Sequence, residues 1–128
     1  MLSARPSELE GGGHPRGALH LCHPGAADAA RLCAGRAPGE VYHVHPSDGS
    51  AHCILSAADA RTLLARGWGE RHPLSGRYGL FGGIPSTFVM VYAPRDAADL
   101  LVHEMCARAA AAYALGEGKG NVEGKTKA

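Results

Sequence analysis

The sequence feature that most constrains the fold is a pair of apolar segments joined by a short turn. Residues 40–45 (EVYHVH) and 51–55 (AHCIL) carry the β-branched and aromatic residues that are typical of strands. The link 46–50 (PSDGS) has Pro at its entrance and an Asp-Gly pair, which tolerates positive φ. The pattern therefore predicts a β-hairpin, with the two strands adjacent in an antiparallel sheet.

Three histidines fall on this hairpin. His43 and His45 are two residues apart in the first strand, so their side chains point to the same face of the sheet. His52 lies across the turn, near enough to share that face. Three imidazoles there can bind a divalent metal with one position open. They can equally supply a general base and a hydrogen-bond donor, or have no chemical role.

Two helices are predicted further along the chain. Ser56 is a favourable N-cap with Asp59 three residues later, and Gly67 ends that helix. The second helix begins at Asp96 and ends at Gly116. Its expected buried stripe consists of residues 98, 101, 102, 105, 106, 109, 112 and 113.

The remaining segments complete an α+β pattern. Residues 18–22 are a short strand candidate, and residues 24–39 are rich in Ala, Gly and Pro with room for one or two helical turns. The Gly- and Pro-rich stretch 67–85 predicts a long loop, and residues 87–93 (TFVMVYA) predict a central strand. The order β-β-β-α-β-α indicates a mostly antiparallel sheet with two helices packed on one face.

The 128 residues correspond to one small domain. We expect a flexible segment over 1–17, the folded α+β domain over 18–115 and a disordered tail over 116–128. A formal net charge of +1 argues against a nucleic-acid partner. The lack of a long apolar run argues against membrane insertion, and the lack of a signal segment makes the cytoplasm the default location. The oligomeric state stays open.

A second polar cluster occupies residues 67–74 (GWGERHPL). Arg71 and His72 there could stabilise an oxyanion and move a proton, and Trp68 could stack on a flat ring. The alternative for Trp68 is a core anchor at the end of the first helix.

Other chemistries have weaker support. A set of soft ligands, His20, Cys22, His23 and Cys33, has no standard zinc spacing. The chain has no Gly-x-Ser-x-Gly elbow and no phosphate-binding loop.

Several separated blocks resemble a known family. They are the His-x-His pair with His52, the block 67–76 (GWGERHPLSG) and the junction 91–96 (VYAPRD). In this order they resemble the luciferase-like domain of fungal luciferases and of uncharacterised fungal and bacterial relatives. The resemblance covers about residues 40–115, and light emission does not follow from it.

The resemblance implies a function. Fungal luciferases oxidise a hydroxylated pyrone with molecular oxygen and no known organic cofactor. We therefore expect a luciferase-like monooxygenase or dioxygenase that takes a small phenolic or hydroxypyrone-type compound, with oxygen as co-substrate. The implied catalytic residues are His43, His45, His52, Arg71 and His72. The implied substrate-binding residues are Trp68, Tyr92 and Arg95.

Two alternatives remain at this point. One is a non-catalytic module that binds a small molecule or a protein on the same scaffold. The other is a metal-dependent enzyme in which His43, His45 and His52 hold a divalent ion.

Overall fold

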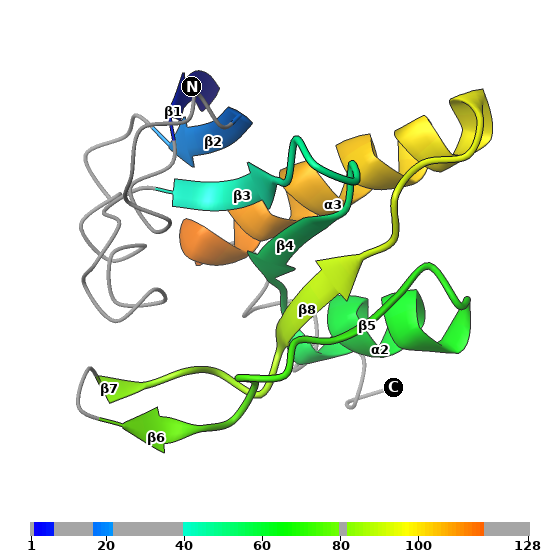
Figure 1. Cartoon of the computed structure of the whole chain (residues 1–128). Coiled ribbons are helices and arrows are strands. Elements are labelled where there is room, and N and C mark those ends of the chain that lie inside the picture. Colours follow the sequence, from blue (N-terminus) through cyan, green and yellow to red (C-terminus); the bar gives the residue numbers. More distant parts are fainter. Residues whose placement is uncertain (1, 7–16, 22–39, 80–81, 117–128) are drawn as a thin grey trace, which may run out of the picture.

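A six-stranded antiparallel sheet organises the protein (Figure 1). The structure, a computed structural model, describes residues 2–6, 17–21, 40–79 and 82–116. The strand order is β1-β2-β3-β4-β8-β5. These strands are β1 (Leu2–Pro6), β2 (Gly17–Leu21), β3 (Glu40–Val44), β4 (Ala51–Ile54), β5 (Gly69–Arg71) and β8 (Phe88–Val91). A separate two-stranded ribbon consists of β6 (Tyr78–Gly79) and β7 (Gly82–Gly83), and the helices are α2 (Ala57–Ala65) and α3 (Ala97–Ala114).

The predicted hairpin is confirmed as β3 and β4. The N–H of His45 donates to the carbonyl of Ser50 at 2.8 Å, and the N–H of Gly49 donates to the carbonyl of His45 at 2.8 Å. Gly49 has a φ of 78°, the positive value that the Asp-Gly pair predicted. In the resulting register, His43 lies directly opposite His52.

The sheet has one face covered by helices. Tyr42, Cys53 and Val89 pair across β3, β4 and β8 and belong to the buried core with residues of both helices. Figure 1 shows α3 along β3 and β4, and α2 beside β5 and β8. The expected α+β class, with both helices on one face, is confirmed.

Both helices start at the residues that the sequence predicts. The Ser56 hydroxyl accepts from the N–H of Asp59 at 3.1 Å, and the Asp96 carboxylate accepts from the N–H of Asp99 at 2.9 Å. Each side chain satisfies a backbone donor that has no partner within the helix.

The expected stripe on α3 is wrong at its largest side chains. Leu101 and Met105 are 60% and 56% exposed. The buried residues of this helix are Cys106, Ala107, Ala110, Ala111 and Ala114. Small side chains let the helix backbone lie close to the sheet, so the contact face is chosen by size rather than by hydrophobicity.

The structure contains strands in two segments for which the sequence predicts none. The stretch 67–85 contains β5 and the β6–β7 ribbon, and β1 forms within the expected flexible segment 1–17. The central strand expected over 87–93 is confirmed as β8, which lies between β4 and β5. The expected helical turns in 24–39 and all but the first residue of the expected tail 116–128 lie outside the described residues. Neither helix of the described ranges combines the length and apolar character needed to cross a bilayer.

Candidate functional site

Four imidazole rings gather on the sheet face opposite the helices. The centroids of His43 and His52 are 4.6 Å apart and their rings stack. The ring of His45 lies 5.1 Å from that of His43 and 4.9 Å from that of His52. His72, which follows β5, adds a fourth ring 5.5 Å from His52. The three hairpin histidines therefore share one face, as their spacing predicts, and the tertiary structure brings His72 to them.

The cluster has a buried floor and an accessible rim. His43 and His52 are only 1% and 8% exposed, whereas His45 and His72 are half-buried. Phe88 stacks on His72 with a centroid distance of 4.3 Å and also lies 5.1 Å from His52. His45 and His72 are therefore the two rings of the cluster that keep part of their surface exposed, and Phe88 lies beside His72.

Glu40 orients the ring of His43 through a contact with Nδ1. Its Oε1 lies 2.9 Å from Nδ1 of His43, and both side chains are 1% exposed. A carboxylate accepts here from the Nδ1–H tautomer, and in the neutral form of that ring the lone pair is on Nε2. Sequence reasoning did not find Glu40, because residues three apart in a regular strand point to opposite faces.

An irregularity in β3 explains the position of Glu40. The pairing of β2 with β3 changes register between Leu19 and His20, opposite Glu40–Tyr42. The extra residue leaves both Val41 and Tyr42 in the core and reverses the alternation, as in a β-bulge. Glu40 therefore reaches the histidine face.

A relay through Ser50 orients His45. The Ser50 hydroxyl donates to Oδ1 of Asp48 at 2.7 Å and lies 2.9 Å from Nδ1 of His45. Since its one proton is directed to Asp48, the hydroxyl accepts from Nδ1–H of His45, and in the neutral ring the lone pair is then on Nε2. The hydrogen bonds from Ser50 hold the pKa of Asp48 below its ordinary value, so the relay ends on an ionised carboxylate.

His72 has the opposite tautomer. The backbone N–H of Leu74 donates to Nδ1 of His72 at 3.1 Å, so in the neutral ring the proton sits on Nε2. Burial, with a further contribution from His45, lowers the pKa of His72, which favours the neutral form. With neutral rings, the site thus combines lone-pair nitrogens on the hairpin with an N–H donor from the residue that follows β5.

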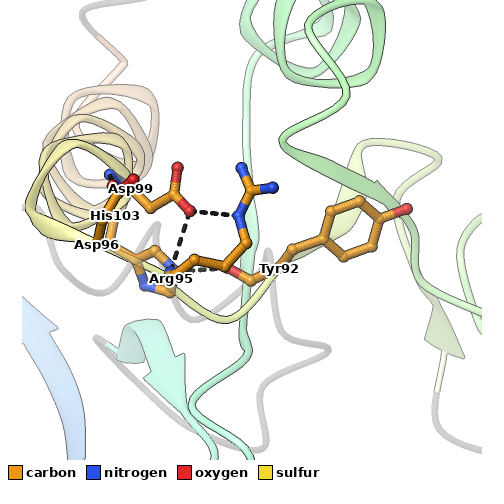
Figure 2. Close-up of polar contacts among 5 residues, drawn as sticks. All are labelled: Tyr92, Arg95, Asp96, Asp99 and His103. Atoms are coloured by element: carbon orange, nitrogen blue, oxygen red, sulfur yellow. Dashed lines mark hydrogen bonds and ion pairs between the residues drawn. The ribbon is translucent and has the colours of Figure 1, made fainter.

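Trp68, Tyr92 and Arg95 meet elsewhere. They line a cavity of about 380 Å³ together with residues of α3, and none of the four clustered histidines lines it. The Arg95 guanidinium lies against the Asp99 carboxylate at 2.8 Å and is 85% exposed (Figure 2). Trp68 also packs against the core, with Arg66 over its ring at 5.6 Å. The expected substrate-binding residues therefore gather, but beside α3.

The described structure does not bring Arg71 into the histidine cluster. Arg71 pairs with Val89, whose side chain belongs to the core face. It lines a separate hollow against α2 that includes Arg61 and Leu64. Adjacent residues of an extended chain point to opposite faces, so placing His72 in the cluster directs Arg71 away from it.

Comparison with known proteins identifies the family of this chain. Residues 38–119 match the model of the Luciferase domain family. A luciferase from Armillaria ostoyae is 38% identical over 88 residues, which are 68% of this chain and 32% of that protein. Luciferases from Armillaria gallica and Neonothopanus nambi are 36% and 34% identical, each also over 88 residues that are 68% of this chain and 32% of the relative.

The chain spans about a third of the length of these relatives. No solved structure matches it. The matched residues include the β3–β4 hairpin and β5, which position all four clustered histidines. The chain thus belongs to the Luciferase domain family.

Proposed function

We propose that the protein is a luciferase-like oxidoreductase that adds molecular oxygen to a small enolic compound of the hydroxypyrone or phenol class. The observation that carries the proposal is the pair of opposed tautomers at the accessible rim. Nδ1 of His45 contacts the Ser50 hydroxyl and Nδ1 of His72 accepts from the Leu74 N–H. The neutral rings therefore present a lone pair at Nε2 of His45 and an N–H at Nε2 of His72. The names of the curated relatives, all luciferases, support the reaction class.

The reaction follows from these two groups. Nε2 of His45 takes the acidic enol proton of the substrate. The enolate carbon forms a C–O bond to oxygen, which is reduced to the peroxide level by the electron pair of the enolate. The peroxide anion then recovers the proton from the His45 imidazolium. Substrate and oxygen give a hydroperoxide, and no external reductant or organic cofactor is consumed.

His72 and the buried rings stabilise the charged species. Nε2–H of His72 donates to the enolate or peroxide oxygen, and the lowered pKa of His72 favours the neutral ring. The Phe88 ring, stacked on His72, gives this side of the cluster an apolar surface. Arg71 has no role in this scheme, because it lies with the residues of α2.

Oxygen consumption tests the proposal. Purified protein is mixed with a panel of hydroxypyrones and catechols, and uptake is followed with an oxygen electrode. We expect His45→Gln to lower the rate by about 10²- to 10⁴-fold, the range for loss of a general base. His72→Gln should lower it as well. His103→Gln is the matched control, because the ring nitrogens of His103 contact the Tyr92 carbonyl and the Tyr42 hydroxyl, each at 2.7 Å, and not the cluster.

The alternative functions give different results. Micromolar binding of these compounds without oxygen uptake would replace the proposal by a non-catalytic binding module. Equal rates in the wild type and in both cluster variants would show that the reaction occurs elsewhere. Circular dichroism of each variant establishes that the fold is retained.

A further inference from the structure

We propose that His43, His45 and His52 bind a divalent first-row transition-metal ion. Glu40 and Ser50 are the positioning residues for two of these ligands. The proposal goes beyond the oxidation reaction, which needs no ion, and it concerns the hairpin alone.

The ligand atoms converge. One ring nitrogen from each of the three histidines lies within 4.8 Å of the others. Four ligands at about 2.0–2.1 Å from an ion lie roughly 3.3 Å apart in tetrahedral geometry. The nitrogens must therefore draw together by at most about 1.5 Å, which small rotations about the side-chain torsions can supply. The backbone already has the required register, with His43 opposite His52.

The surrounding hydrogen bonds are those of metal-ligating histidines. Glu40 holds Nδ1 of His43 at 2.9 Å, and Ser50 holds Nδ1 of His45 at 2.9 Å. Metal-bound histidines characteristically donate the second ring N–H to a carboxylate or another acceptor, which fixes the ring and directs the lone pair to the ion. Two such contacts on one hairpin indicate a metal site more specifically than three neighbouring histidines alone.

The charges also fit. Glu40 is buried to 1% exposure and places its carboxyl group directly behind His43. Asp48 ends the second relay. Two carboxyl groups behind three imidazole ligands form a donor set that suits a divalent cation. Imidazole ligands favour Zn²⁺, Fe²⁺, Co²⁺ or Cu²⁺ over Mg²⁺ and Ca²⁺, which prefer oxygen ligands.

Three protein ligands leave a position open for water or substrate. The half-buried rim at His45 and His72 provides access to it. When bound, the ion supplies Lewis-acid chemistry that acidifies a coordinated enol or water. Ion binding and proton acceptance use the same nitrogen of His45. Oxygen uptake by stripped and by loaded protein therefore separates this proposal from the preceding one.

Cobalt titration tests the site without reference to activity. Protein without a histidine tag is stripped with a chelator and titrated with Co²⁺, and the visible d–d spectrum and bound equivalents are recorded. We expect one equivalent per chain and a spectrum of nitrogen and oxygen ligands. An intense near-ultraviolet thiolate-to-cobalt band would assign the ion to cysteines and overturn the proposal.

Variants locate the ion. We expect His45→Gln to weaken Co²⁺ binding at least about 100-fold, and Glu40→Gln to weaken it about 10- to 100-fold with a shifted d–d spectrum. His103→Gln should bind as the wild type does. If the buried Glu40 variant does not fold, Ser50→Ala tests the same positioning role. No binding at micromolar Co²⁺, or equal binding by the wild type and His45→Gln, would overturn the proposal.

Discussion

Substitution of Gly69 by Ala should destabilise the protein more than the same substitution at a glycine that has room for a Cβ. Gly69 begins β5 and pairs with Val91 of β8. A Cβ at this position would overlap the carbonyl oxygen of Met90 and lie 2.7 Å from Cδ2 of Leu63. Carbon atoms in good contact are about 3.5–4.0 Å apart, so β5 must move away from β8 by roughly 1 Å.

The cost follows from the bonds that this movement stretches. The Tyr92 N–H donates to the Trp68 carbonyl at 2.9 Å, and the His72 N–H donates to the Phe88 carbonyl at 3.0 Å. These bonds flank Gly69 and would lengthen past useful geometry, at about 1 kcal/mol each, while overpacking adds about 1–3 kcal/mol. We expect a total loss of about 3–5 kcal/mol in the free energy of unfolding.

Urea denaturation followed by circular dichroism measures this loss. Gly67→Ala is the matched control, because Gly67 has a φ of 69° and no atom within 4 Å of the added Cβ. That variant carries only the left-handed backbone strain of about 1 kcal/mol. Since β5 leads into His72, Gly69→Ala should also disturb the histidine cluster. A Gly69→Ala protein as stable as Gly67→Ala would refute the reasoning.

Two further predictions concern the core. Leu63 is 2% exposed, so Leu63→Ala should lower the free energy of unfolding in urea by about 2–5 kcal/mol, whereas Leu100→Ala, at a residue 57% exposed, should change it by less than about 0.5 kcal/mol; similar losses would contradict the packing described. Burial raises the pKa of the Cys106 thiol to about 11, and an unfolded thiol ionises near 8.5. Its contribution to stability is therefore complete below pH of about 8.5 and is lost as pH rises toward the folded value. From mildly to strongly alkaline pH, the urea midpoint of Cys106→Ala should fall less than that of the wild type. Equal falls would contradict the raised pKa of the Cys106 thiol.

The local parts of the site could be predicted from the sequence because their causes lie within a few residues. A turn with Asp-Gly closes the hairpin, and strand alternation then places His43 and His45 on one face. The helix starts at Ser56 and Asp96 are equally local, since each cap bonds a backbone N–H three residues ahead.

The positions of other residues at the site could not be predicted from the sequence, because they depend on contacts between distant segments. Glu40 reaches His43 because β2 pairs with β3 through a register shift, which no pattern within residues 40–45 reveals. The block 67–74 reads as one loop in the sequence. Its pairing with β8 sends Arg71 to the helix face and His72 to the histidine face.

By itself, the sequence determined the α+β class, the hairpin, the helix starts and the shared face of three histidines, because short-range hydrogen bonding and strand alternation set each of them. Only the tertiary structure decided which face of α3 is buried, since close approach to the sheet selects alanines over the larger Leu101 and Met105. It also decided that Glu40 and His72 join the histidines while Arg71 does not. Strand register and bulges fix those positions, and both arise from pairing between segments far apart in the chain.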